Sequence, residues 1–482
     1  MIFDFNRFHL LVLITWQFTI FFASQQIFPI FSNYLPEWQC GDGPLGKDCD
    51  EYRRCGGNVT FGEKAFDSAA LEFRWICDDS YWASFFSQIQ FAGVLCGTLS
   101  FGTASDFIGR KPVAVFALSM GIAASFVSGI VNSVYILLAT RLLVGLAIGG
   151  CLVVVCTFVM EMLLPQQRMA LRAFFNWGTA RLLMTLICMY AREWRFSSHL
   201  CAAMAVPALM ILIFIFPESP TWLHSKGRIH DMRESEKAIA RRAGVPYVPV
   251  THKKIEKSKS LFEVLKGGLI KRLIVLWMMW FTASTCGYAT DLNSNTISGD
   301  LYVNQILFSI LIAVSKMILV AVDTNIPGFS RRNLHQGAQL GVVICFGTLT
   351  VLTLINYNGV AFLVINLLGT VFVEYTWDAC YLCAVESMET SSRASATGSC
   401  SLVARIGAIL APTLAYLNQH WSASVYFIVV VLGTINLVQS YFFLVETKGV
   451  VLDNVTVTDD SLQALAQSEE EAIELENGQE KK

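Results

Sequence analysis

Charge is scarce in this sequence of 482 residues. Asp, Glu, Lys and Arg make up 15% of it, whereas about a quarter of an ordinary soluble protein is charged. Hydrophobic residues make up 54%, and the mean hydropathy is +0.52. Charge-poor runs of about 20 residues, the length that crosses a bilayer, recur along most of the chain. These features exclude an ordinary soluble protein and predict a membrane protein with many spanning helices.

The motifs of enzymes and ATP-driven pumps are lacking too. The sequence has no Walker A loop, no cluster of metal ligands and no nucleophile paired with a base. We therefore expect neither an enzyme nor a primary pump, no cofactor, and no nucleic acid among the partners. We also expect no cleavable signal peptide, because the first apolar run, His9 to Ile30, is too long for one.

Twelve apolar runs predict twelve transmembrane helices. They cover residues 9–31, 83–103, 112–131, 134–160, 172–191, 199–217, 272–292, 302–322, 335–355, 359–382, 395–417 and 423–445. Basic residues gather on one side of this arrangement, at Arg110, Lys111, Arg168, Arg172, Arg331, Arg332, Arg393 and within residues 218–272. Because basic connections favour the cytoplasmic side, we expect both termini in the cytoplasm.

The expected fold is all-α, with two six-helix halves. We expect the N-terminal half over residues 1–217, a cytoplasmic linker over 218–271 and the C-terminal half over 272–446. An acidic cytoplasmic tail follows over 447–482, and its composition is typical of disorder. One long polar loop, about residues 32–82, interrupts the N-terminal half on the extracellular side.

Four of the 14 cysteines, Cys40, Cys49, Cys55 and Cys77, lie in this loop. They flank the sequon at Asn58, which points to an oxidising, glycosylating compartment. We expect two disulfides, with three possible connectivities, and glycosylation at Asn58. A zinc site is the less favoured alternative, because the loop has neither a CxxC pair nor a histidine cluster.

Charged residues repeat between the two halves. Glu161 and Glu386 lie 225 residues apart, and each is followed seven positions later by an arginine. Asp106 and Asp323 lie 217 residues apart. Such markers at the ends of two six-helix halves are typical of parallel repeats related by an axis normal to the membrane.

Several motifs carry a family resemblance. Gly102–Lys111 resembles the loop between helices two and three of the major facilitator superfamily. The further motifs are Arg141-Leu-Leu-Val-Gly145, Trp194-Arg195, Pro217-Glu-Ser-Pro-Thr-Trp-Leu223, Arg405-Ile-Gly and Glu446-Thr-Lys-Gly449. Together, over about residues 10–450, they resemble the organic ion transporter family of solute carriers, which carries organic cations, zwitterions and anions. The resemblance implies the twelve-helix major facilitator fold and transport by alternating access.

The resemblance also implies a cytoplasmic gate made of ion pairs. Its expected members are Asp106, Arg110, Arg141, Glu161, Arg168, Asp323, Glu386 and Arg393. Phe107, Thr221, Ser330 and Glu389 depart from the family's motifs in this region, so the departures concern gating rather than fold.

Ionisable side chains inside apolar helices point to the substrate site, because each costs several kcal/mol unless it is paired or hydrated. Arg405 lies twelve residues past Arg393, about 18 Å at helical rise, and hence near the middle of the bilayer. Arg181 is similarly central and shares a helix face with Trp177, which makes a cation–π contact feasible. Lys316 is a further candidate, with snorkelling to the membrane surface as the alternative.

Members of the family that carry anions have basic residues at the positions of Lys316 and Arg405. Their pocket aromatics coincide with Trp177, Tyr288, Trp377 and Tyr381. The resemblance therefore implies a pocket for amphipathic carboxylates, in which aromatic walls supply apolar contact and a cation fixes one end.

Glu374 and Asp378 leave two interpretations open. They neutralise Arg405 or Arg181 as buried pairs, or they bind a cation, a proton or the ammonium group of a zwitterion. We expect a plasma-membrane secondary active or facilitative transporter of small organic ions, with anions favoured and a counter-anion or coupling ion as a possible partner beside the lipid bilayer. An organic cation or carnitine-like zwitterion transporter is the alternative, and a non-transporting receptor or scaffold is the rival from another class.

Overall fold

The computed structural model describes residues 6–445, apart from residues 42, 44, 48, 164–175, 249–262, 264, 266–269, 327, 328, 358, 389 and 419. Within these residues, eleven helical segments are long and apolar enough to cross a membrane. One more helix, α10 (Trp177–Ala191), follows the gap at 164–175. The predicted all-α membrane architecture is confirmed.

The first membrane span of the N-terminal half is interrupted by a short 3-10 helix. The helices of this half are α1 (Arg7–Ala23), η1 (Ser24–Ile27), α2 (Pro29–Ser32), α5 (Tyr81–Ile108), α6 (Arg110–Ser128), α7 (Val134–Gly150), α8 (Cys156–Met162), α10 and α11 (Trp194–Phe214). One turn of π-helix, η3 (Cys151–Val155), joins α7 to α8 in a continuous span.

The C-terminal half contains a corresponding series of membrane-spanning helices. Its helices are α15 (Ile270–Asn293), η4 (Ser294–Thr296), α16 (Leu301–Asn325), α17 (Arg331–Leu354), α18 (Val360–Glu386), α19 (Thr390–Leu417) and α20 (Ser424–Phe443). Each of the twelve predicted apolar runs overlaps one of these helical spans, and the ends differ by at most five residues.

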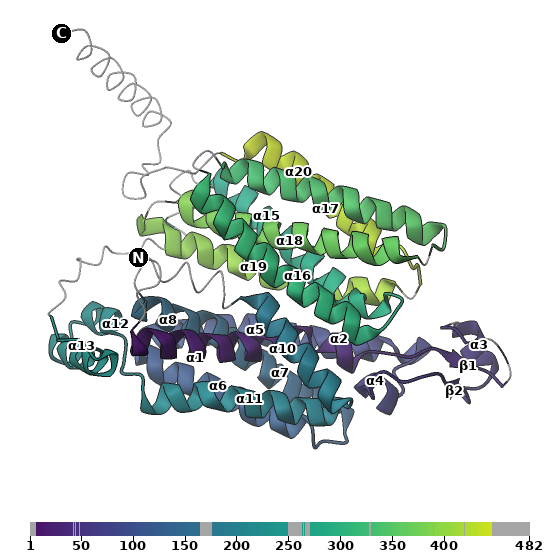
Figure 1. Cartoon of the computed structure of the whole chain (residues 1–482), viewed down its shortest axis with the longest axis horizontal. Coiled ribbons are helices and arrows are strands. Elements are labelled where there is room, and N and C mark those ends of the chain that lie inside the picture. Colours follow the sequence, from purple (N-terminus) through teal and green to yellow (C-terminus); the bar gives the residue numbers. More distant parts are fainter. Residues whose placement is uncertain are drawn as a thin grey trace, which may run out of the picture.

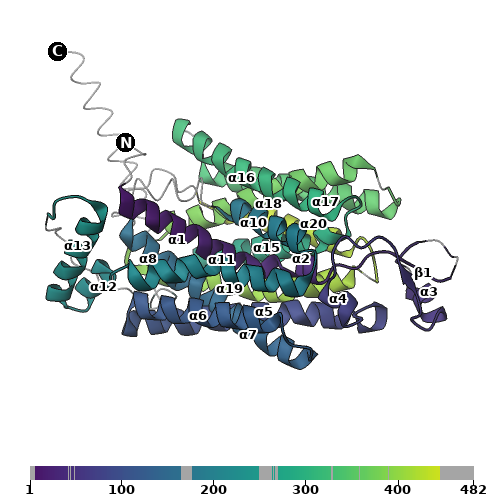
Figure 2. The same cartoon turned by 60° about the horizontal axis from the view of Figure 1, so that its bottom comes forward.

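The two halves lie side by side, the first in purple to teal and the second in green to yellow (Figure 1). The loop after α2 projects from one end; it contains β1 (Trp38–Gln39), α3 (Cys49–Arg54), β2 (Thr60–Phe61), α4 (Ala69–Glu72) and η2 (Cys77–Asp79). Two short helices after α11, α12 (Pro220–Ser225) and α13 (Ile229–Ala243), lie at the opposite end in both views (Figures 1 and 2). We call these ends the loop end and the linker end.

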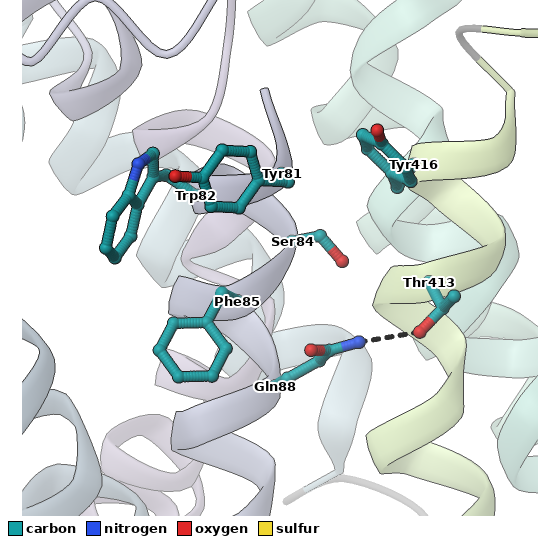
Figure 3. A pocket seen from close by; sticks show the side chains of 7 residues that line it. All are labelled: Tyr81, Trp82, Ser84, Phe85, Gln88, Thr413 and Tyr416. Carbon is teal, nitrogen blue, oxygen red and sulfur yellow. Dashed lines mark hydrogen bonds between the residues drawn. The ribbon is translucent and has the colours of Figure 1, made fainter. Parts of the chain in front are cut away.

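Contacts between the halves lie toward the loop end. Gln88 of α5 donates a hydrogen bond of 2.6 Å to the Thr413 hydroxyl of α19 (Figure 3). The Tyr302 hydroxyl donates to the carbonyl of Ala65 at 2.8 Å. Every hydrogen bond or ion pair that joins two described residues of different halves lies between the loop end and the middle of the helices. The loop end is therefore closed in this conformation.

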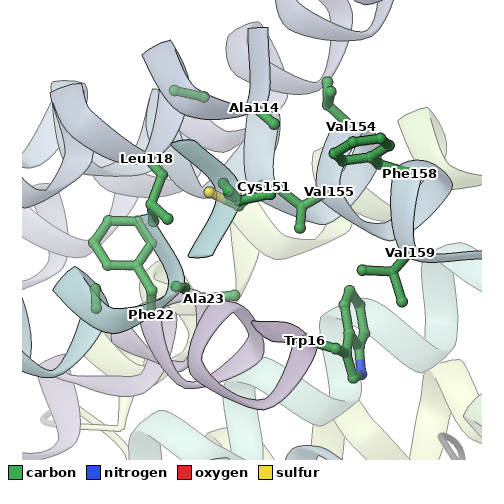
Figure 4. Close-up of a cluster of buried hydrophobic side chains, with 14 of the residues drawn as sticks. Trp16, Phe22, Ala23, Ala114, Leu118, Cys151, Val154, Val155, Phe158 and Val159 are labelled. Atoms are coloured by element: carbon green, nitrogen blue, oxygen red, sulfur yellow. The ribbon is translucent and has the colours of Figure 1, made fainter. Parts of the chain in front are cut away.

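The apolar core of the N-terminal half surrounds the π-helical turn. Phe22, Leu118, Cys151, Val155 and Phe158 are all buried and gather between α1, α6 and the span of α7 and α8 (Figure 4). This packing fixes the linker-end part of that span, which carries Glu161.

Disulfides cross-link the loop, and its side chains contact both halves. It contains two disulfides, as predicted, and the structure selects Cys40–Cys55 and Cys49–Cys77 from the three connectivities. Asn58 is exposed between α3 and β2, and its glycosylation stays a prediction. Phe66 of the loop contacts Phe31, and Phe31 contacts Tyr302 of the other half, at ring-centroid distances of 5.8 and 6.3 Å.

Glu72 ties the loop to the N-terminal half. Its carboxylate accepts hydrogen bonds from the Trp194 indole at 2.8 Å and from Arg195 Nε at 3.0 Å. Burial raises the pKa of the Glu72 carboxyl, but the hydrogen bonds from Arg195 and Trp194 outweigh burial, so the pKa lies below its ordinary value.

We predict that Glu72 makes stability pH-dependent. A carboxyl whose pKa is lowered by folding stabilises the folded state above its ordinary pKa, and this stabilisation is lost as the pH falls through the lowered value. The difference in melting temperature between the wild type and Glu72→Gln should therefore be largest at neutral pH and shrink below about pH 4. A difference that stays constant across this range would contradict the assignment.

Helices α5 and α7 approach closely through glycines. A Cβ atom on Gly145 would lie 2.0 Å from the carbonyl oxygen of Gln90, and one on Gly97 would lie 2.0 Å from that of Leu146. Small residues at a helix interface permit this close backbone contact in a membrane.

We predict that Gly145→Ala destabilises the protein by about 1–3 kcal/mol or more, because overpacking forces the two backbones apart. Gly337→Ala on α17 is the matched control, since no atom lies within 4 Å of its added Cβ. Thermal unfolding of both variants in detergent measures the effect. Equal melting temperatures for the two variants would show that the α5–α7 contact tolerates a side chain.

Candidate functional site

Three cations predicted for the substrate site lie within the helices, and each has a different surrounding. Arg181 projects from α10 and is 1% exposed. Its guanidinium forms an ion pair with Asp291 of α15, and Nη2 donates a hydrogen bond of 2.7 Å to Gln305 of α16. The partners belong to the other half, so Arg181 joins the two halves and its charge is neutralised.

The sequence made a cation–π contact between Arg181 and Trp177 feasible, but Arg181 makes this contact with another ring. The guanidinium carbon of Arg181 lies 5.4 Å from the ring centroid of Phe308 on α16. Trp177 instead packs against two apolar clusters, one within the N-terminal half and one that also contains Leu301 and Tyr302 of the C-terminal half. The four-residue spacing fixes only a shared helix face, whereas the neighbouring helix supplies the ring that the cation meets.

Lys316 of α16 is neutralised by two carboxylates of α18. Its Nζ lies 2.8 Å from Glu374 Oε2 and 2.7 Å from Asp378 Oδ2. Lys316 therefore points into the C-terminal half rather than snorkelling to the membrane surface. With both acids ionised, this cluster carries a net charge of −1.

Arg405 of α19 lies at the interface of the halves. Its Nη1 donates to Gln26 Oε1 at 3.5 Å, and the Tyr288 hydroxyl donates to the same oxygen at 2.9 Å. Arg405 Nε is buried without a hydrogen-bond partner. Within the described part of the chain, Arg405 has no ion-pair partner. The acids that the sequence left open for it, Glu374 and Asp378, pair with Lys316 instead.

The aromatic residues form two groups beside these charges. Trp377 and Tyr381 of α18 pack against Trp280 of α15, at centroid distances of 5.8 and 4.4 Å. Tyr288 packs edge-on against Phe91 of α5, across the interface between the halves, at 4.8 Å. The set predicted as one pocket is thus divided between a wall of the C-terminal half and the contact between the halves.

At the linker end, Arg110 stands at the centre of the N-terminal cluster. Its Nη1 lies 2.7 Å from Asp106 Oδ1, and its Nε lies 3.6 Å from Glu161 Oε1. Glu218 completes the cluster: Oε1 accepts from the backbone N–H groups of Arg110 and Lys111 at 3.1 Å each. A carboxylate at these first N–H groups of α6 also complements the helix dipole.

The C-terminal cluster repeats this arrangement. Arg331 at the start of α17 forms an ion pair with Asp323 and lies 3.2 Å from Glu386 Oε1. The following basic residues correspond as well: Lys111 Nζ donates to the carbonyl of Phe216 at the end of α11, and Arg332 donates to that of Tyr441 at the end of α20, both at 2.6 Å. The repeat seen in the sequence therefore corresponds to a repeated ion-pair network.

Two predicted gate residues that the structure describes, Arg141 and Arg393, do not join these two clusters. Arg141 of α7 is fully buried between Phe28 and Phe86, 4.9 and 5.2 Å from their ring centroids, and lies near the loop end. Arg393 donates to the carbonyl of Met388 at 3.3 Å. Arg168 lies outside the described residues.

Sequence reasoning missed Asp291, Gln26, Gln305, Trp280 and Glu218 as partners in these networks. Asp291 carried a usable signal, because an acid next to the end of an apolar run needs a partner. The glutamines carried none, since a neutral amide in a membrane helix has many structural uses.

A family model described as sugar (and other) transporter matches residues 50–458. The chain belongs to this family. The uncharacterized protein F23F12.3 of Caenorhabditis elegans is 35% identical over 93% of this chain and 94% of its own length. Solute carrier family 22 member 15 of Xenopus tropicalis is 27% identical over 76% and 70%, and the organic cation transporter protein of Drosophila melanogaster is 25% identical over 79% and 72%.

The fold is that of the major facilitator superfamily. The partially occluded, inward-open xylose transporter XylE of Escherichia coli matches with a TM-score of 0.65 at 15% identity, over 92% of this chain and 99% of its own. The predicted fold and the organic ion transporter family are confirmed. The relatives with an assigned role are transporters, among them a member of solute carrier family 22, and the chain is a transporter rather than an enzyme, as expected.

We predict that Lys316→Met destabilises the protein by about 3–5 kcal/mol, because it leaves two partly buried carboxylates without their cation. The triple variant Lys316→Met, Glu374→Gln, Asp378→Asn should recover most of this loss, since it removes the whole charge cluster. Thermal unfolding of purified variants measures both effects. If Lys316→Met alone were neutral, the lysine would not be held in this cluster.

Proposed function

We propose that this transporter carries organic anions across the plasma membrane by alternating access, with the loop end outside the cell and both termini in the cytoplasm. The observation that carries the proposal is the state of the three central cations. Arg181 and Lys316 have carboxylate partners, whereas Arg405 has none in the described residues. A charged group in this position needs compensation, and a substrate carboxylate supplies it.

The surroundings of Arg405 suit an amphipathic carboxylate. The Tyr288 ring and Phe91 offer apolar contact beside the guanidinium, and Gln26 holds it with a single long hydrogen bond of 3.5 Å. Such a bond is weak and easily exchanged for a charge-assisted bond to a carboxylate. Gln26 and Arg405 belong to different halves, so a substrate bound here would sense their relative position.

The hydrogen bonds support a rocking movement. Bonds that hold the loop end closed, such as Gln88 with Thr413, cross between the halves and must break when that end opens. The clusters around Arg110 and Arg331 each lie within one half and can move as units. We infer that residues 1–217 and 272–446 are the moving halves, that 218–271 links them and that 447–482 is a cytoplasmic tail.

A second candidate function is transport of an organic cation or a carnitine-like zwitterion. It is favoured by the net charge of −1 on Lys316, Glu374 and Asp378, with side chains that are 12%, 14% and 29% exposed. The similarity to an organic cation transporter protein supports the same alternative. A zwitterion would use both features, with its ammonium at the acids and its carboxylate at Arg405.

We predict that Arg405→Ala lowers uptake of a labelled aromatic carboxylate by about 10- to 100-fold at unchanged surface abundance, the loss that corresponds to a charge-assisted hydrogen bond. Arg405→Lys should retain part of the uptake. Arg54→Ala, in the exposed part of the loop, is the matched control and should leave uptake unchanged.

Labelled quaternary ammonium, tested in the same cells, separates the two functions. Ammonium uptake that is lost in Glu374→Gln or Asp378→Asn and is indifferent to Arg405→Ala would overturn the anion proposal. Uptake of neither compound, with the protein at the cell surface, would favour a receptor or scaffold.

A further inference from the structure

A cavity of about 420 Å³ lies at the loop end, between the loop and both halves. Its polar lining comes from all three parts: Ser84 and Ser87 from the N-terminal half, Asn293 and Asn418 from the C-terminal half, and Asn33, Trp38 and Lys47 from the loop. None of the central residues around Arg405 lines it. Cavities of this size hold small organic molecules.

Hydrogen bonding in the wall of this cavity is incomplete. Trp38 is 4% exposed, and its indole N–H has no hydrogen-bond partner. The side-chain oxygens of Asn33 and Asn418 are buried and accept no hydrogen bond. Leaving a buried polar atom unpaired costs about 1–3 kcal/mol, so a ligand that these side chains rotate to meet gains affinity from the new hydrogen bonds.

The charge of the lining has one sign. Lys47 is the one charged side chain among the described residues that line the cavity, and it has no ion-pair partner there. The disulfide Cys49–Cys77 lines the same cavity and ties the segment that carries Lys47 to the start of α5. A carboxylate is therefore the group that this lining favours.

An aromatic groove adjoins the cavity. Tyr81 and Phe85 of α5 and Tyr416 of α19 line it, and Gln88 of α5 donates a hydrogen bond to Thr413 of α19 beside them (Figure 3). Ser84 and Tyr416 line both the groove and the cavity. Within the cavity itself, the Tyr416 ring thus offers aromatic surface to the apolar part of a ligand.

We propose that the cavity is a second, outer ligand site for a small aromatic carboxylate that also carries an O–H or N–H donor. The carboxylate meets Lys47 and the Trp38 indole, and the donor meets Asn33 or Asn418. Because its walls belong to both halves, a bound ligand stabilises the conformation in which the loop end is closed. The site goes beyond the proposed transport function and does not depend on Arg405.

The test uses the purified full chain in nanodiscs and equilibrium dialysis with labelled 6-hydroxy-2-naphthoate. In the Arg405→Ala background, which removes the proposed central site, one saturable site should remain. Adding Lys47→Gln should weaken it about 10-fold, and adding Trp38→Phe, which keeps the ring but removes the N–H, should weaken it several-fold. 2-Naphthoate, which lacks the donor, should bind less tightly than the hydroxy compound.

Lys64→Gln is the matched control, because Lys64 lies in the same loop but does not line the cavity. Equal binding by Lys47→Gln and Lys64→Gln, or no saturable binding in the Arg405→Ala background, would overturn the outer site. The transport proposal fails by a different result, namely carboxylate uptake that survives Arg405→Ala. Melting temperatures without ligand show whether each variant is folded.

Discussion

A charged side chain between membrane helices is unfavourable by several kcal/mol unless a neighbour compensates it, and the helices of this protein are arranged around that constraint. Arg181 joins the two halves because its carboxylate partner, Asp291, belongs to the other half. Lys316 draws two acids of α18 toward α16. Among the described residues Arg405 has no such partner, and this difference is the basis of its proposed role in binding a charged substrate.

The clusters at the linker end follow a different logic. Arg110 and Arg331 each gather acids from several helices of their own half, and Glu218 binds the backbone at the start of α6. Bonds of this kind hold helix ends together without linking the halves. The proposed rocking movement needs two rigid halves and a contact between them that can open. The ion pairs within each half suit the first requirement, and the hydrogen bonds between the halves at the loop end suit the second.

The sequence was sufficient for the fold and for the repeat, because apolar runs and paired charges are local signals. It placed Asp106 and Arg110 together at the gate, because only three residues separate them in the chain. It did not reveal that Glu374 and Asp378 belong to Lys316, because partner choice depends on how neighbouring helices are rotated about their axes. Arg141 illustrates the same limit: its motif suggested the gate, but the direction of α7 brings it near the loop end, between two phenylalanines.

The π-helical turn at Cys151–Val155 sets the phase of the span that contains it. A π-turn accommodates one extra residue, and one residue of an α-helix corresponds to a rotation of about 100°. The segment before the turn presents Gly145 to α5, and the segment after it presents Glu161 to Arg110. The contacts at both ends of this span therefore constrain the number of residues between Gly145 and Glu161 as well as the residue types. A chain shorter by one would still cross the membrane, yet Glu161 would be rotated by about 100° from its present direction toward Arg110.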